Sequence, residues 1–483
     1  MKVGIFTLRI KNNFDSKKRI ILLAVILFGS FLAILNQTLM LPALASIMED
    51  MDVTANTVQW LTTGFMMLNG IMIPITAFFI DRFSNRRLFI GAMGILALGS
   101  LVCAFAPNFQ LLLLGRLIQA TSVGIIMPMM QTLVMYLFPR EKRGYAMGIQ
   151  GIVIGFAPAI GPTLSGLIVD TLGWQYIFYI IIPLTVVDMI AAYFLMPNLT
   201  EPGHPRLDIF SIILSTIGCG GVLYGCSMAG SFGWANVNSW APIGIGITAL
   251  AFFAYRQYKL DEPFLNIFVL KHKSFLVGTI LAMTTFGLMI SCENLLPLYI
   301  QNALGDSALV SGLVMLPGAI LMGVFSPITG KLFDQFGPRG LALAGFLIIA
   351  GTNLGLTKIT LETSVIMLGV LYSIRLLGIT MITMPMTTWG LNSLDNNLLA
   401  HGTSVNACFR QIFGSIITAV MITTMTNTQN KFIDPASADA MLKGFQNSFL
   451  LSTFLAVLLL LLSYFTVHDY ENIAAIHRRK QKA

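Results

Sequence analysis

The sequence predicts an all-α polytopic membrane protein of fourteen spans, arranged as two six-helix bundles with two extra central helices. Three observations predict this fold: the hydropathy, the distribution of charges and an internal repeat. Of the 483 residues, 56% are hydrophobic and 10% are charged, whereas soluble domains have roughly 25% charged residues. So much apolar sequence suits helices in lipid, because each spanning helix needs about 20 apolar residues.

The same composition excludes several other classes of protein. A disordered chain would be polar, and a porin-type barrel would show a weaker alternating hydropathy. The five cysteines are scattered through apolar stretches, without the spacing of a disulfide scaffold, a metal site or a redox motif. We therefore expect small buried cysteines in a helical bundle.

The spans follow from apolar runs divided at glycine, proline and charged residues. The first run follows a basic tail and lacks a small-residue cleavage site, so we expect a retained span and not a signal peptide. The predicted helices lie at about 20–47, 57–80, 88–106, 109–138, 144–170, 174–196, 207–230, 240–258, 274–302, 307–333, 339–358, 363–391, 400–427 and 445–467.

Lysine and arginine residues gather on one side of this arrangement. When successive loops alternate between the two sides, 23 of these residues lie on one side, 3 lie on the other and 3 lie within spans. An excess of positive charge marks the cytoplasmic side, so both termini are predicted in the cytoplasm. The net charge of +8 then orients the chain in the bilayer, and no nucleic acid is needed to explain it.

An internal repeat indicates how the helices are grouped. Residues 74–83 (PITAFFIDRF) match residues 327–336 (PITGKLFDQF) at an offset of 253, and each copy ends a span on the predicted cytoplasmic side. Parallel repeats of six helices are a plan that transporters use. The predicted divisions are a tail at 1–19, a bundle at 20–200, two inserted helices at 201–260, a bundle at 261–468 and a basic tail at 469–483.

The loop after the second span places an acid at a helix end, followed by three arginines. Such an acid can pair with a nearby guanidinium in one conformation and release it in another; a simple orientation anchor is the alternative. The residue order resembles the loop signature of the major facilitator superfamily, although Ala77 and Ser84 replace its two glycines. The matching residues are Asp81, Arg82, Arg86 and Arg87. The resemblance implies a conformational switch, to which the repeat adds Asp334.

The fifth span carries glycines four residues apart, which let another helix approach closely, and two prolines, which remove backbone donors and bend the helix. Close packing alone explains most such glycines. The pattern also resembles the signature of the superfamily's antiporter branches, in which a kinked fifth helix gates against the other half. The matching residues are Gly155, Pro158, Gly161, Pro162 and Gly166.

Arg116 lies in the fourth span and should face the bundle interior, because a charge within the membrane needs a partner. Gln119 follows about one turn later and is expected on the same face. The surrounding residues resemble the family's arginine motif, which implies a role in proton relay. Pairing of Arg116 with backbone carbonyls is the structural alternative.

Two acids lie within spans: Asp188 in the sixth and Glu293 in the ninth. A carboxyl group there can be neutral when it is closed to water and ionised when it is open, as proton exchange requires. A permanently protonated or hydrogen-bonded acid is the alternative. We rank the two equally as proton-coupling or cation-recognising residues.

The first span contains Asn36, Gln37 and Thr38 in a context that resembles the fourteen-helix drug:proton antiporter branch, the QacA and EmrB type, in which Asp is common at the position of Asn36. An amide hydrogen-bonds substrate but does not exchange a proton. Coupling would then fall on another residue. Arg375 and Arg410 are the other cations within spans, and for Arg410 the alternative is a side chain that reaches the lipid headgroups.

The resemblance covers nearly the whole chain and implies a proton-coupled multidrug efflux antiporter of the cell membrane, which exports amphipathic, often cationic, small molecules by alternating access. An exporter or exchanger of a specific metabolite, lipid or siderophore would share the fold, and sodium coupling is also open. The sequence holds no nucleotide-hydrolysis, metalloprotease or serine-hydrolase motif. We expect no enzymatic activity, cofactor or metal; the expected partners are substrate, protons and lipid, with the monomer as the functional unit.

Overall fold

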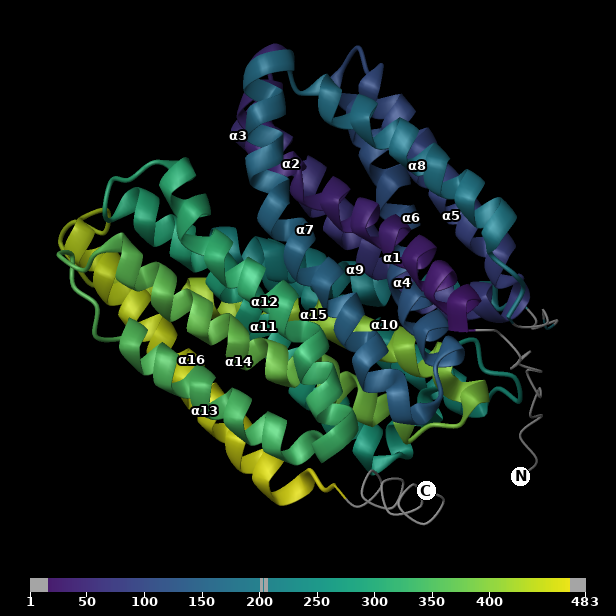
Figure 1. Ribbon diagram of the computed structural model, residues 1–483. Helices are drawn as coiled ribbons and strands as arrows, with labels where there is room; N and C mark the ends of the chain where they lie inside the picture. Colours follow the sequence, from purple (N-terminus) through teal and green to yellow (C-terminus); the bar gives the residue numbers. More distant parts are fainter. Residues whose placement is uncertain (1–15, 200–202, 204–206, 470–483) are drawn as a thin grey trace.

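The computed structural model describes residues 16–199, 203 and 207–469, and every regular element in that part is helical (Figure 1). Fourteen helices there are long and apolar enough to span a membrane, which confirms the predicted number. The predicted tails at 1–19 and 469–483 lie almost wholly outside the described residues. The helices are α1 (Ser16–Thr38), α2 (Met40–Asp50), α3 (Ala55–Val58), α4 (Trp60–Arg82), α5 (Asn85–Ala104), α6 (Phe109–Leu137), α7 (Arg143–Leu172), α8 (Gln175–Leu195), α9 (Ile209–Phe232), α10 (Val237–Lys259), α11 (Lys273–Asn302), α12 (Ala308–Phe336), α13 (Pro338–Leu356), α14 (Val365–Asn392), α15 (Leu399–Gln429) and α16 (Ala438–Thr466).

The first predicted span consists of two helices, α1 and α2, and not of one. Pro42 has no N–H to donate to the carbonyl of Thr38, four residues earlier, so one helical hydrogen bond is missing there. Leu39 between the helices keeps helical angles, with φ −61° and ψ −22°. The break is therefore local, and α2 continues the direction of the span.

Side-chain caps set where several spans begin. The Asn108 side chain accepts a hydrogen bond from the amide of Leu111 at 2.9 Å, at the start of α6. Serines act in the same way at the starts of α12, α14 and α16, namely Ser307, Ser364 and Ser437. The cap at Ser437 explains why α16 begins at Ala438 and not near the predicted 445: it satisfies a free backbone donor of a first turn too polar for the hydropathy to mark as a span.

The long helices form two sets, α1–α8 and α11–α16, which lie together at one end and diverge toward the other (Figure 1). We call the end where they meet the basic end, because Arg82, Arg140 and Arg339 lie there. One hydrophobic core runs through α1–α8 and includes Met384 and Val405 of α14 and α15, while a second core lies within α11–α16. Apolar packing is thus continuous between the sets at the basic end.

Helices α9 and α10 pack against each other beside both sets. Gly221 and Gly246 make this close approach possible, since a Cβ on either would lie 2.7 Å from a backbone atom of the other helix. Toward α4, Tyr224 of α9 stacks on Trp60 with ring centroids 6.0 Å apart. Toward α15, the sulfur of Cys219 lies 3.8 Å from that of Cys408. Helix α9 therefore contacts both α4 of one set and α15 of the other.

Candidate functional site

Polar contacts join the two sets of helices at the basic end. The carboxylate of Asp334, at the end of α12, accepts hydrogen bonds from the amides of Gly144 and Tyr145 at the start of α7, each at 2.9 Å. An acid is well placed there, because a helix N-terminus presents unpaired amides and a positive dipole end. The Arg143 side chain adds hydrogen bonds to the Asn392 and Asn396 side chains, each at 3.2 Å.

The repeat partner of Asp334 makes the corresponding contact with a different group. Asp81, at the end of α4, lies 3.3 Å from Nε2 of His401 in the first turn of α15. The other ring nitrogen, Nδ1, accepts a hydrogen bond from the amide of Asn266 at 3.2 Å. A neutral imidazole with its hydrogen on Nε2 satisfies both contacts. Each set thus presents an acid to the first turn of a helix in the other set.

The sequence led us to expect a guanidinium beside Asp81, and the structure places His401 there. Arg86 lies instead over the ring of Tyr193 on α8, with its Cζ 4.6 Å from the ring centroid. The imidazole partner comes from a residue more than three hundred positions away in the sequence, so no local motif indicates it.

The glycines of α7 divide into two groups with different neighbours. Near the basic end they face α12: a Cβ on Gly148 would lie 2.5 Å from the carbonyl oxygen of Ser326, and one on Gly155 would lie 3.0 Å from the Met322 side chain. Beyond Pro158 they do not: a Cβ on Gly161 would meet Thr38 of α1, and Gly166 has open space. Of the expected gate residues, Gly155 faces the other set, while Gly161 packs within its own.

Arg116 is held by a set of acceptors inside α1–α8. Its guanidinium donates to the carbonyls of Asn36 and Leu61, at 3.3 and 3.5 Å, and to the Gln119 side chain at 2.7 Å. Its Cζ lies 4.3 Å from the centre of the Phe65 ring. Arg116 is 1% exposed. The expectation that Arg116 and Gln119 share a face is confirmed.

Arg375 is held in the corresponding way inside α11–α16. It donates to the carbonyl of Leu288 on α11 at 2.7 Å and to the Asn353 side chain on α13 at 2.9 Å. In the first set, helix α5 contributes Ser100, whose hydroxyl accepts a hydrogen bond from the Gln119 side chain at 2.9 Å. Ser100 and Asn353 differ by 253 positions, the offset of the sequence repeat. Sequence reasoning missed the equivalence of Ser100 and Asn353, although the offset of the repeat could have revealed it.

Glu293 lies on α11 near Arg375, on a face that is only partly covered. The side chains at 286, 290, 293 and 297, spaced by one helical turn, are all half-buried, whereas the side chains of Leu288, Cys292 and Leu295 are buried. Arg375 interacts with Glu293 electrostatically, and the NH1 atom of Arg375 is buried without a hydrogen-bond partner. Glu293 therefore lies on the partly covered face of α11, while the incompletely paired guanidinium of Arg375 is buried.

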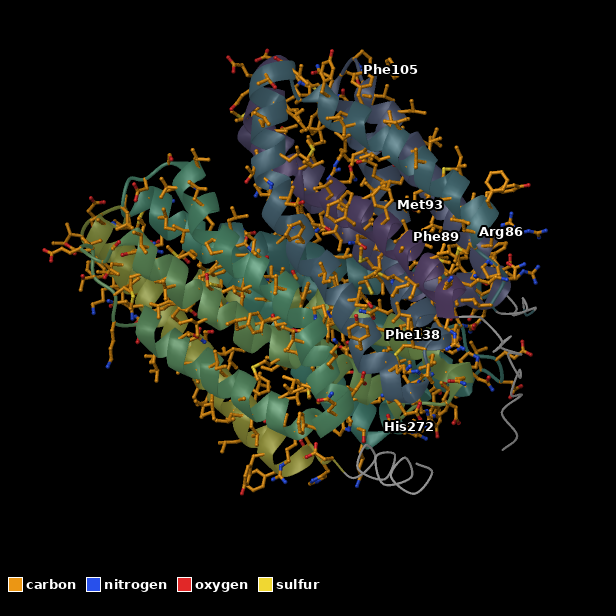
Figure 2. All side chains as sticks on the ribbon, viewed as in Figure 1. Arg86, Phe89, Met93, Phe105, Phe138 and His272 are labelled. Carbon is orange, nitrogen blue, oxygen red and sulfur yellow. The ribbon has the colours of Figure 1, made fainter. Side chains whose placement is uncertain are left out.

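Asp188 is in a different environment, enclosed among helices of the first set. It is 1% exposed, and its Oδ2 has no hydrogen-bond partner. A Cβ on Gly29 of α1 would lie 2.5 Å from this oxygen and 2.6 Å from the Phe89 ring of α5. Phe89 and the nearby Met93 are marked in Figure 2. The structure thus separates Asp188 from Glu293: the first is buried and the second is half-buried.

Two polar residues of α1 lie close to the Arg116 cluster. The Asn36 side chain is buried, and neither its Oδ1 nor its Nδ2 has a hydrogen-bond partner, although its carbonyl accepts from Arg116. Gln37, next along the helix, is half-buried. The Asn36 amide is therefore an unpaired polar group next to the enclosed Arg116.

Arg410 of α15 differs from both buried arginines. Its Cζ lies 4.5 Å from the centre of the Phe286 ring on α11, and its Nε is buried without a hydrogen-bond partner. Arg410 as a whole is half-buried. The structure therefore does not bring Arg410 together with Arg116 or Asp188. It places Arg410 against the half-buried face of α11 that also carries Glu293.

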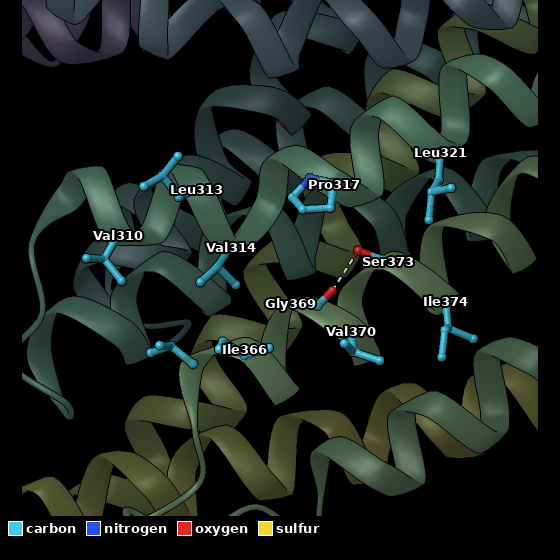
Figure 3. Close-up of a pocket in the computed structure, with 11 residues that line it drawn as sticks. Val310, Leu313, Val314, Pro317, Leu321, Ile366, Gly369, Val370, Ser373 and Ile374 are labelled. Atoms are coloured by element: carbon cyan, nitrogen blue, oxygen red, sulfur yellow. Dashed lines mark hydrogen bonds between the residues drawn. The ribbon is translucent and has the colours of Figure 1, made fainter.

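A separate apolar pocket of about 590 Å³ lies between α12 and α14 (Figure 3). Val310, Pro317 and Leu321 line one side, and Ile366 and Ile374 line the other. The hydroxyl of Ser373 is satisfied by the carbonyl of Gly369 at 2.6 Å. This pocket offers no charged group, and none of the predicted site residues lines it. Within the described part of the chain, no three metal-ligating side chains come together either.

Comparison with known proteins identifies the family. Residues 26–419 match the family model described as Major Facilitator Superfamily. The MFS-type transporter YcnB of Bacillus subtilis is 48% identical over 92% of this chain and 94% of the relative. The lincomycin resistance protein LmrB of Listeria monocytogenes is 38% identical, over 92% and 96%, and the multidrug transporter protein MdtP of Bacillus subtilis is 29% identical, over 82% and 74%.

Two solved structures share the fold at low sequence identity. The human organic anion transporter MFSD10 has a TM-score of 0.65 at 14% identity, covering 92% of this chain and 99% of its own. The proton:xylose symporter XylE has a TM-score of 0.63 at 14% identity, covering 94% and 97%. The chain therefore belongs to the Major Facilitator Superfamily and is a multi-pass cell-membrane transporter of small molecules, not an enzyme.

Proposed function

We propose that this transporter is a proton-coupled multidrug efflux antiporter, which exports amphipathic, cationic small molecules by alternating access. Glu293 carries the proposal. It is a half-buried carboxyl group within a span, on the accessible face of α11 and beside a buried arginine. A group so placed can hold either a proton or a cationic substrate, and exchange between the two is antiport.

The arrangement of the helices supports alternating access. Between α1–α8 and α11–α16, the side-chain hydrogen bonds and the Asp81–His401 contact of the described residues all lie at the basic end, which we place in the cytoplasm on the charge distribution. We propose that the conformation seen in the structure is the one that is closed to the cytoplasm. Breaking the Asp334 and Asp81 contacts would open that end.

The remaining candidates have distinct proposed roles. Asp188, whose Oδ2 is unpaired within the first set, is proposed to change protonation with the conformation. Arg116 holds helices of the first set together, and Arg375 does so in the second. Asn36, Gln37 and Gln119 are proposed to line the substrate path beside Arg116. Relatives named for lincomycin and multidrug resistance support drugs as the substrate class.

The first test measures transport of a cationic dye into everted vesicles, with an imposed proton gradient and, separately, a sodium gradient. We expect Glu293→Gln to reduce proton-driven uptake at least about tenfold, because an amide cannot exchange the proton. Asp188→Asn should reduce it as well. Glu362→Gln, which changes an exposed acid between α13 and α14, is the matched control. Proton-driven uptake that persists in the Asp188→Asn, Glu293→Gln double variant would refute the coupling assignment.

A further inference from the structure

Arg410 lacks the acceptors that the other two arginines within spans possess. Arg116 donates to two main-chain carbonyls and Arg375 to one, each also donates to an amide side chain, and both are at most 1% exposed. For Arg410 the structure shows the Phe286 ring and an unpaired Nε. A guanidinium inside the membrane is costly without hydrogen-bonded or charged partners. The guanidinium of Arg410 is therefore open to a ligand that brings its own acceptors.

The side chain of Arg410 does not reach toward the nearest membrane surface. Its Cα is 11 residues beyond the start of α15 at the basic end, and Phe286 is 13 residues beyond the start of α11 at the same end. At 1.5 Å per residue these positions are about 16 and 20 Å from that end. The guanidinium lies over the Phe286 ring, and this ring packs on Gly414, one turn farther from the basic end than Arg410, so the guanidinium extends inward. A cation that snorkelled to the headgroups would extend the other way.

The surroundings of Arg410 leave room for this ring and hold it in place. Gly414, one turn farther along α15, lies under the Phe286 ring, and a Cβ there would be 3.2 Å from a ring carbon. The ring thus fits between Gly414 and the guanidinium. A guanidinium stacked on a ring keeps its edge free to donate two parallel hydrogen bonds to a carboxylate.

No acid of the described chain forms an ion pair with Arg410. Glu293 is the acid on the face of α11 that Arg410 contacts through Phe286. Glu293 is seven residues beyond Phe286 on the same face of α11, about 10 Å along the helix. Between them, the hydroxyls of Ser291 and Thr418 lie 3.4 Å apart and join α11 to α15. One wall therefore offers a cation and an acid two turns apart.

We propose that Arg410 and Phe286 form an oxyanion subsite of the substrate path, which takes a carboxylate or an equivalent group of the transported molecule. The proposal rests on the proposed transport function and narrows it: the preferred substrates carry an oxyanion together with the amine that Glu293 recognises. Phe286 supplies the stacking surface, and Arg410 supplies the charge and the paired donors.

The test uses a rhodamine dye with a free carboxylate and the methyl ester of the same dye, with binding measured by fluorescence anisotropy on purified protein in lipid nanodiscs. The two dyes share their ring system and amines and differ only in the oxyanion. We expect Arg410→Gln to weaken binding of the carboxylate dye at least about tenfold and to change binding of the ester less than about threefold. Arg410→Lys should keep most of the preference.

A second variant guards against misfolding of Arg410→Gln. Phe286→Leu removes the stacking ring but no charge. We expect it to weaken binding of the carboxylate dye, by a smaller factor than Arg410→Gln does. Phe454→Leu, at a position 61% exposed on α16, is its control. An equal loss for both dyes, an unchanged affinity for the carboxylate dye, or no binding of either dye to the wild-type protein overturns the subsite. If the preference depends on Arg410 but no proton-driven transport occurs, the proposed function fails and the subsite stands.

Discussion

Three arginines within spans show that one residue type is held in different ways by its neighbours. Arg116 and Arg375 are enclosed by carbonyl and amide acceptors, which is the structural alternative that the sequence left open for Arg116. Arg410 has an aromatic ring in their place. The difference lies in residues contributed by other helices, so the local sequence around each arginine does not show it.

Asp208, just before the span of α9, pairs with Arg256 in the last turn of α10 and gives a pH-dependent prediction. At the start of α9, Asp208 accepts two hydrogen bonds from Arg256, at 2.8 and 3.0 Å. These bonds lower the pKa of the Asp208 carboxyl from 3.8 to about 2. Because the folded value lies below the unfolded one, the pair stabilises the folded protein above about pH 4, and this contribution is lost as the pH falls from 4 toward 2.

Asp208→Asn should therefore lower the melting temperature slightly at neutral pH, and the difference from wild type should shrink below about pH 4. The effect is small because solvent screens a pair that is partly exposed. Melting curves across this pH range measure it, with the exposed Asp261→Asn as the control. A difference that is constant with pH would show that Asp208 acts in some other way.

At the scale of single helices, α7 combines two interfaces in one element. Its glycines near the basic end let it approach α12, and Gly161, beyond Pro158, lets it approach α1. The sequence indicated the close approaches but not their partners. A glycine pattern states that a neighbour comes near, whereas the identity of the neighbour depends on how the helices are arranged.

Gly148→Ala should destabilise the closed basic end. The added Cβ would lie 2.5 Å from the Ser326 carbonyl oxygen and 2.9 Å from the Pro327 Cα, and backbone atoms cannot move aside as a side chain does. We expect a loss of about 1–3 kcal/mol in stability, typical of an overpacked interface. Thermal unfolding in detergent measures it.

The matched control is Gly312→Ala on α12, where a Cβ meets no atom within 4 Å. This variant gains the same helix propensity without a clash. Equal melting temperatures for the Gly148→Ala and Gly312→Ala variants would contradict the contact between α7 and α12.

At the scale of the whole molecule, the repeat produces a near-symmetric closure with one asymmetric side. Asp334 and Asp81 each meet the first turn of a helix from the opposite set. On one side α7 packs against α12 and α9 is absent, whereas on the other α9 contacts both α4 and α15 beside their own contact. The inserted helices therefore cover one of the two seams between the sets.

Cysteine labelling tests the orientation of this arrangement in the membrane. The native cysteines are buried or half-buried, so an impermeant maleimide should react mainly with introduced thiols. We expect Ile433→Cys, in the exposed turn between α15 and α16, to be labelled in intact cells, because the positive-inside rule places that end outside. Glu141→Cys, at the basic end, should be labelled only after permeabilisation. The reverse pattern would overturn the predicted orientation.

The sequence by itself determined the number of spans, the family and the short set of polar residues within the membrane. These follow from hydropathy, repeat and local motifs, because each span must satisfy its own backbone and so leaves its mark within about 20 residues. Only the tertiary structure decided which partners those residues meet: Asp81 meets His401, Arg375 meets Asn353, and Arg410 meets Phe286. Such pairs join helices that are distant in sequence, and side-chain packing between helices, which no local pattern encodes, brings them together.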